Sequence, residues 1–108
     1  MKFRIISWEQ FQHYKDKDDI LLLDLREKEA YQKEHLPHAI WTDWEHIEEN
    51  IPFLLEEAHR DITWIILYCE RGNTSLLCAR DLARYGYPTI SLNGGFLAWK
   101  RLQNSGIS

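Results

Sequence analysis

A run of five apolar residues, Trp64–Tyr68, is followed by a short polar stretch and then by an apolar pattern of helical period. The run has aromatic residues at both ends and isoleucines inside, the composition of a β-strand that is buried on both faces. From Ser75 onward, apolar residues recur at spacings of three and four until Gly86, a residue suited to the position just after a helix. Because doubly buried strands belong to parallel sheets covered by helices, this segment predicts an α/β fold with Trp64–Tyr68 as a central strand.

Cys69 lies between this predicted strand and this predicted helix. The first N–H groups of a helix have no intrahelical partner and carry partial positive charge, so a loop entering the helix can direct several of them at one point. Gly72 permits such a loop and Arg71 adds positive charge, whereas Glu70 opposes that effect unless it points to solvent. We therefore predict a nucleophilic Cys69 whose thiolate is favoured. The alternative is an inert, buried cysteine, which a strand end before a polar loop disfavours.

Three motifs, in the same order along the chain, resemble those of the rhodanese family of sulfurtransferases. Residues 68–75 resemble its active-site loop, in which a cysteine opens the pattern C-x-x-G-x-T/S/R before a helix. Residues 22–26, Tyr31 and residues 35–40 resemble the upstream pattern of D-x-R, an aromatic residue and G-H-I/L-P-G-A, and residues 92–99 resemble the closing L-x-G-G-x-x-x-W. Glu34 and His38 stand where the family usually has glycines.

This resemblance implies a sulfurtransferase in which the Cys69 thiolate attacks the outer sulfur of an anionic donor such as thiosulfate. Sulfite leaves, Cys69 carries a persulfide, and a thiol, cyanide or a protein acceptor then removes the sulfur. The resemblance implies no cofactor. The residues expected to bind the substrate, through main-chain N–H groups and side chains, are Glu70, Arg71, Gly72, Asn73, Thr74 and Ser75.

Two other functions remain open at this point. Cysteine phosphatases and arsenate reductases also hold a thiolate in an anion-binding loop, but the related pattern C-x-x-x-x-x-R ends in an arginine that clamps phosphate oxygens, and Ser75 occupies that place here. The sequence also allows a persulfide carrier or regulatory module acting with a protein partner, because Glu70 disfavours a dianionic donor relative to a neutral or protein-bound one.

The composition excludes several other classes. The 108 residues are 44% hydrophobic and 13% aromatic, which predicts one folded domain over residues 1–108. A net charge of −4, with both signs mixed along the chain, predicts no nucleic-acid partner. No apolar run approaches a membrane span and residues 1–6 lack a signal-peptide core, so we expect a cytoplasmic protein with no membrane partner. Two cysteines and five scattered histidines match no metal-binding spacing.

The remaining segments alternate between strand and helix patterns. Strands are expected at residues 3–6, 20–23, 39–41, 64–68 and 89–92. Helices are expected from Ser7 to about Lys15, over 27–33, from Thr42 through Glu48 with a second piece at 51–59, from Ser75 to Gly86, and over 96–102 before a frayed tail at 104–106. The alternation predicts a three-layer α/β/α domain with a mostly parallel central sheet of about five strands. Ligands bind such sheets at the carboxyl ends of the strands, where Cys69 lies.

Charged residues near the predicted site have two interpretations. Asp24 and Arg26 follow the second strand and either contribute to the field around Cys69 or form a structural ion pair or helix cap, and we favour the structural interpretation. His35 or His38 could act as a general base, but a thiolate stabilised by its loop needs no proton acceptor.

Cys78 and the glycine pair Gly94-Gly95 also have two readings each. Cys78 lies three residues after Ser75, in the first turn of the predicted helix, and is either a thiol that resolves oxidised Cys69 or a buried helix residue; we favour burial. The glycine pair resembles part of a phosphate-binding loop but lacks a following Lys-Ser/Thr, so we predict a turn that lets Phe96 and Trp99 dock.

Overall fold

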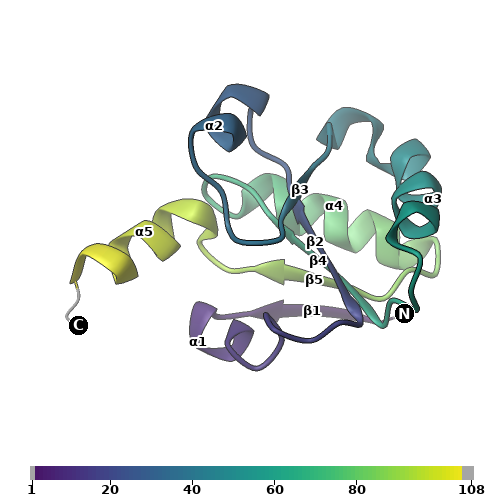
Figure 1. The fold of residues 1–108 in the computed structure, drawn as a ribbon, viewed down its shortest axis with the longest axis horizontal. Coiled ribbons are helices and arrows are strands. Elements are labelled where there is room, and N and C mark those ends of the chain that lie inside the picture. Colours follow the sequence, from purple (N-terminus) through teal and green to yellow (C-terminus); the bar gives the residue numbers. More distant parts are fainter. Residues whose placement is uncertain (1, 106–108) are drawn as a thin grey trace.

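The computed structural model describes residues 2–105, in which strands and helices alternate along the chain (Figure 1). The strands are β1 (Phe3–Ile6), β2 (Ile20–Asp24), β3 (Ile40–Trp41), β4 (Trp64–Tyr68) and β5 (Thr89–Leu92). The helices are α1 (Trp8–Phe11), α2 (Lys28–Lys33), α3 (Ile47–Ala58), α4 (Asn73–Arg84) and α5 (Gly95–Ser105), with the short 3-10 helix η1 (Trp44–His46) before α3. Within residues 2–105, no helix has the length and apolar character needed to cross a membrane.

The five strands form one sheet in the order β1-β5-β4-β2-β3, with every neighbouring pair parallel. This confirms the predicted parallel α/β sheet with β4 at its centre. β2 and β4 pair in register from Ile20 opposite Trp64 to Asp24 opposite Tyr68, so the two strands end at the same edge. Residues that follow β2 and β4 are therefore brought together at the carboxyl edge of the sheet.

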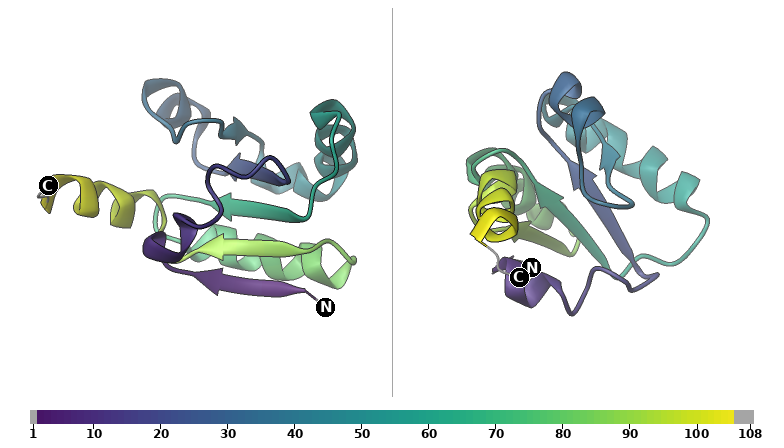
Figure 2. Two further views of the ribbon diagram at one scale, coloured as in Figure 1. Left: turned by 60° about the horizontal axis from the view of Figure 1, so that its bottom comes forward. Right: turned by 60° about the vertical axis from the view of Figure 1, so that its left-hand side comes forward.

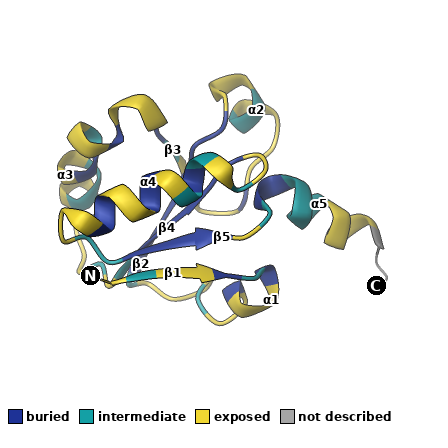
Figure 3. Ribbon diagram, turned by 180° about the vertical axis from the view of Figure 1, so that it is seen from behind, coloured by how far each residue is buried: buried dark blue, intermediate teal, exposed yellow. Residues whose placement is uncertain are grey.

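Both faces of the sheet are buried, because alternate side chains of each strand enter different cores. On one face, Leu21 and Leu23 of β2 meet Ile65 and Leu67 of β4 under α3 and α4. On the other, residues of β2, β4 and β5 pack with side chains of α1 and α5, among them Trp8, Phe11 and Phe96. Figure 2 gives two further views of the sheet and its helices, and Figure 3 shows buried and exposed residues alternating along α4. This two-sided burial explains the unbroken apolar runs.

Several predicted element ends were wrong. The capping box of Ser7 and Gln10 is present, but α1 ends at Phe11 and the chain continues as turns, with the Tyr14 N–H bonded to the Phe11 carbonyl, rather than as a helix to Lys15. Only Trp8 and Phe11 of this helix are buried, so one helical turn suffices to place them. The third strand is Ile40–Trp41, without Ala39.

The break predicted at Asn50 is absent, because Ile47–Ala58 form one continuous helix, α3, which contains Pro52. The start of the first predicted piece is instead the 3-10 helix η1. Pro52 has no N–H group, so the helix loses one backbone hydrogen bond there. The burial of Ile47 and Ile51, on the same face on both sides of the predicted break, outweighs that loss. Helix α4 begins at Asn73, two residues earlier than predicted, so Cys78 lies in its second turn. Helix α5 runs to Ser105 where a tail was predicted from Asn104, and Gly106 lies outside the described residues.

The turn after α2 replaces one expected glycine with a strained residue. His38 has a φ of 69°, in the left-handed region that glycine favours, whereas Glu34 is extended with a φ of −165°. We expect His38→Gly to raise the free energy of unfolding by about 0.5–1 kcal/mol, since relief of strain exceeds the added entropy of the unfolded chain. His38→Ala keeps the strain and serves as the control in urea unfolding. A His38→Gly variant less stable than His38→Ala would contradict this reading.

Candidate active site

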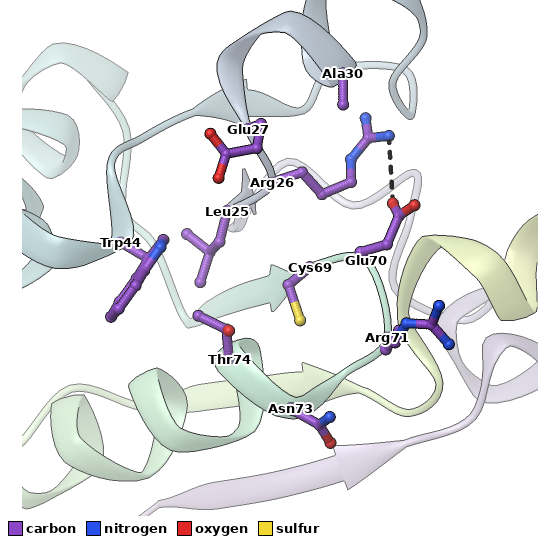
Figure 4. Close-up of a pocket in the computed structure, with 10 residues that line it drawn as sticks. All are labelled: Leu25, Arg26, Glu27, Ala30, Trp44, Cys69, Glu70, Arg71, Asn73 and Thr74. Atoms are coloured by element: carbon purple, nitrogen blue, oxygen red, sulfur yellow. Dashed lines mark ion pairs between the residues drawn. The ribbon is translucent and has the colours of Figure 1, made fainter.

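Cys69 follows β4 directly and lies at the carboxyl edge of the sheet, in a pocket of about 390 Å³ (Figure 4). One wall comes from the loop and the start of α4, and the opposite wall from the segment after β2 and from η1. The lining residues are Leu25, Arg26, Glu27, Ala30, Trp44, Cys69, Glu70, Arg71, Asn73 and Thr74. Five of the seven residues predicted for the site therefore share this pocket, and Gly72 and Ser75 contact the sulfur instead.

The Cys69 sulfur receives two main-chain hydrogen bonds from its own loop. The Gly72 N–H lies 3.1 Å and the Ser75 N–H 3.3 Å from Sγ. Gly72 has a φ of 97°, which turns the chain so that its N–H faces back toward Cys69. Gly72 is the N-cap of α4 and Ser75 lies in its first turn, where N–H groups have no helical partner and the helix dipole is positive. The loop is thus built to stabilise negative charge on this sulfur.

A chain of two buried hydroxyls extends this environment away from the pocket. Ser75 Oγ lies 3.5 Å from Cys69 Sγ and 3.0 Å from Ser91 Oγ, and both serines are at most 1% exposed. A thiolate can only accept, so when Cys69 is ionised the Ser75 hydroxyl donates to Sγ and accepts from Ser91. Ser91 lies on β5, sixteen residues from Ser75, and no local sequence pattern marks it.

The glycine pair at the start of α5 lets this helix hold the loop from its other side. The Phe96 N–H donates to the Cys69 carbonyl at 2.8 Å and the Leu97 N–H to the Glu70 carbonyl at 3.0 Å. A Cβ on Gly95 would lie 2.5 Å from the Cys69 carbonyl oxygen. The predicted turn is present and Phe96 is buried, but the sequence reading missed that this turn lets α5 bond to the cysteine loop.

Asp24 and Arg26 form the expected ion pair beneath the pocket wall. Arg26 Nη2 lies 2.8 Å from Asp24 Oδ2 and its Nε 3.1 Å from both carboxylate oxygens, and Asp24 is fully buried. The Tyr68 hydroxyl donates to Asp24 at 2.6 Å, and burial together with this bond raises the pKa of Tyr68. The guanidinium of Arg26 also stacks on the Phe96 ring at 3.8 Å. The ion pair of the favoured interpretation is therefore present, and Arg26 additionally lines the pocket.

The two charged side chains beside Cys69 point to different places. Glu70 is directed toward Arg26, with a closest approach of 4.0 Å between Oε1 and Nη1. Arg71 is exposed, and Figure 4 shows its guanidinium directed away from the Cys69 sulfur. Trp44 lines the wall that faces the cysteine loop and Thr74. It was not predicted for the site because it comes from a different element, η1.

Cys78 is a free, buried thiol in α4, as the favoured reading predicted. Burial, reinforced by the charges of Asp81, Cys69 and Glu48, raises the pKa of its thiol to about 11. At pH 8, on the order of one Cys78 in a thousand is a thiolate, so iodoacetamide should modify Cys69 and spare Cys78 in the folded protein. Modification of Cys78 should rise only as the pH approaches 11, because the raised pKa keeps the thiol protonated below it. Peptide mass mapping checks this, and equal labelling of both cysteines at pH 8 would contradict it.

The histidines take no part in this pocket. His35 Nδ1 lies 2.7 Å from the Tyr31 carbonyl oxygen and its ring stacks on that tyrosine, and neither His35 nor His38 lines the pocket of Cys69. Within residues 2–105, no group of three or more His, Cys, Asp or Glu side chains could hold a metal ion.

Comparison with known proteins agrees with this geometry. A family profile described as Rhodanese-like domain matches residues 7–102. A protein of Pseudoalteromonas translucida (strain TAC 125) named thiosulfate sulfurtransferase GlpE is 32% identical over 101 residues, which cover 93% of this chain and 91% of the relative.

Two solved structures resemble most of the chain. A rhodanese-related protein from Thermoplasma volcanium has a TM-score of 0.74 at 21% identity, covering 91% of each chain. A protein from Rhodopseudomonas palustris CGA009, described as of unknown function and a possible tyrosine phosphatase, has a TM-score of 0.77 at 19% identity, covering 98% of this chain and 85% of that chain. At these identities, the two structures establish a shared fold and nothing about activity.

Proposed function

Because the chain belongs to the rhodanese-like domain family, we propose that it is a sulfurtransferase that carries sulfane sulfur on Cys69. The observation that supports this most is the pair of main-chain N–H groups, from Gly72 and Ser75, directed at Sγ. These donors favour an anionic sulfur, first the thiolate and then the persulfide. Thiosulfate is the proposed donor, and the name of the Pseudoalteromonas translucida relative includes it.

The proposed reaction has two steps. The Cys69 thiolate attacks the outer sulfur of thiosulfate, the sulfur–sulfur bond of the donor breaks with its electron pair, and sulfite leaves. Cys69 is then a persulfide whose outer sulfur lies in the pocket. A thiolate or cyanide attacks that sulfur and releases the Cys69 thiolate, which the N–H groups of the loop stabilise as the leaving group.

The loop is less suited to phosphate or arsenate. Ser75 occupies the seventh position of the loop, where the phosphatase pattern has arginine, and its fully buried side chain already contacts Cys69 and Ser91. It cannot serve as a bidentate clamp on phosphoryl oxygens. This favours sulfur transfer over the phosphatase reading.

Steady-state turnover tests the proposal. The wild type should convert thiosulfate and cyanide to sulfite and thiocyanate and leave p-nitrophenyl phosphate unchanged, and Cys69→Ser should be inactive while remaining folded. Hydrolysis of the phosphate ester in place of sulfur transfer would overturn the proposal in favour of a phosphatase.

Arg71 is proposed to attract the anionic donor. Its exposed guanidinium points away from Sγ. We therefore expect its positive charge to strengthen donor binding through the local electric field, and not to stabilise the transition state. Arg71→Ala should raise KM for thiosulfate about 3- to 10-fold and change kcat less than about 2-fold, and added salt should reduce the difference. Arg80→Ala, which removes an exposed positive charge from α4, is the matched control. An unchanged KM in Arg71→Ala would defeat this role.

A protein-bound donor or acceptor is a second candidate for the same chemistry. Glu27 and Glu70 line the pocket with Arg26 and Arg71, so the wall offers no excess of positive charge to a dianion. A sulfur exchanged with a cysteine of a partner protein would not require such an excess.

A further inference from the structure

A second hollow adjoins the pocket of Cys69. It lies between the segment 44–49 and helix α4, has a volume of about 390 Å³, and shares Trp44 and Thr74 with the Cys69 pocket. We call this hollow the lateral groove. Because the two hollows have a wall in common, a chain segment lying in the lateral groove would have its end beside Cys69.

The floor of the lateral groove exposes large apolar side chains. Trp44 is 45% and Leu77 54% exposed, and both line the groove. Exposed tryptophan and leucine side chains that line one groove next to a reactive cysteine are typical of a protein-binding surface, whose affinity is concentrated in a few apolar anchors.

The rim of the lateral groove is acidic. Glu45, Glu48, Glu49 and Asp81 line it, and among the described lining residues there is no lysine or arginine. Glu49 lies 3.4 Å from His46 and Asp81 lies 3.4 Å from Arg84, whereas no ion pair of the described residues involves Glu45 or Glu48. This rim repels thiosulfate and nucleic-acid phosphates and complements a partner segment that carries lysine or arginine.

The Cys69 sulfur is accessible only to a slender group, since Cys69 is 5% exposed at the base of its pocket. A partner that exchanges sulfur with it must therefore present its own cysteine on a narrow segment rather than on a flat face. The lateral groove provides a place to hold that segment.

We propose that the lateral groove binds a segment of a sulfur-accepting protein, and that this segment carries a cysteine flanked by lysine or arginine. This proposal rests on the function proposed above. The partner's cysteine thiolate attacks the outer sulfur of the Cys69 persulfide, the sulfur–sulfur bond breaks, and Cys69 leaves as a thiolate while the partner carries the persulfide. An apolar residue near the partner's cysteine packs between Trp44 and Leu77, and the flanking cations lie against Glu45 and Glu48.

Two model peptides test this inference. Both contain one cysteine next to leucine, one flanked by lysines and the other by glutamates, and each is supplied as the mixed disulfide with thionitrobenzoate. The Cys69 thiolate attacks the peptide sulfur and releases coloured thionitrobenzoate, so the rate reports delivery of the peptide to Cys69. Cys78→Ser is the background, and a neutral disulfide, 2-hydroxyethyl disulfide, measures the intrinsic reactivity of Cys69.

At low salt, the lysine peptide should react at least about 10-fold faster than the glutamate peptide, and salt should reduce the ratio. The double variant Glu45→Gln/Glu48→Gln should bring the ratio to about 2 or less without changing the rate with the neutral disulfide. Glu56→Gln/Glu57→Gln, which removes two exposed carboxylates at the other end of α3, is the matched control and should keep the ratio. Leu77→Ser should slow both peptides.

Equal rates for the two peptides, or a ratio that both double variants lower equally, would overturn the docking proposal. The exchange reaction involves no sulfane sulfur, so it is readable even in a protein that transfers none. A retained peptide preference without persulfide formation would therefore refute the proposed function and leave the groove assignment standing.

Discussion

Gly95→Ala is expected to lower the free energy of unfolding by about 3 kcal/mol or more and sulfur transfer by at least about 100-fold. Gly95 has a φ of 65°, and a Cβ there would lie 2.5 Å from the Cys69 carbonyl oxygen and 2.6 Å from the Glu70 carbonyl oxygen. Both contacts are with backbone, so the methyl group can be accommodated only if α5 and the cysteine loop separate. That separation breaks the bonds from Phe96 and Leu97 that position the loop.

Gly86→Ala separates backbone strain from this close contact. Gly86 also has a positive φ, 98°, but a Cβ there would have no atom within 4 Å. We expect it to lower stability by about 1–2 kcal/mol and to leave turnover unchanged. Urea unfolding and thiosulfate turnover of both variants check the prediction, and equal effects on activity would show that α5 does not hold the loop.

Asp24→Ala is expected to lower the free energy of unfolding by about 3–5 kcal/mol, because it leaves the Arg26 guanidinium buried without its carboxylate. Arg26 is 8% exposed, and Asp24 supplies both oxygens of its fork as well as the acceptor for the Tyr68 hydroxyl. Urea unfolding measures the loss. Asp24→Ala/Arg26→Met should recover a large part of it, since the double variant removes both charges.

The exposed pair Asp81–Arg84, at 3.4 Å, is the control for the buried pair. Asp81→Ala should change stability by less than about 1 kcal/mol, as expected for an ion pair in water. A similarly small loss for Asp24→Ala would show that the buried pair does not fasten the end of β2 beside the active-site loop.

The fold was predictable because its sheet is buried on both faces. Each of the runs Ile20–Leu23 and Trp64–Tyr68 is apolar throughout, a pattern that follows from helices covering both sides. The position of Cys69 was predictable for the same reason, as it follows the central strand directly. Helix ends were less predictable, since α3 continues through Pro52 on the strength of side chains buried in the sheet.

The parts of the site that sequence reasoning missed come from distant elements. Ser91 and Gly95 reach the cysteine loop from β5 and α5, and Trp44 lines the pocket from η1. Their roles depend on how those elements pack. The paired glycines were the one signal available, since adjacent positive-φ residues permit close backbone approach. Nothing in a local pattern specifies which backbone is approached.

The measurement that most directly tests a sulfur-carrying Cys69 is the intact mass of the protein after brief exposure to thiosulfate. The wild type and Cys78→Ser should each gain one sulfur, which cyanide or dithiothreitol should remove, and Cys69→Ser should gain none. A mass gain of one sulfur in Cys69→Ser would contradict the proposed persulfide on Cys69. So would an unchanged mass of folded wild type that consumes thiosulfate.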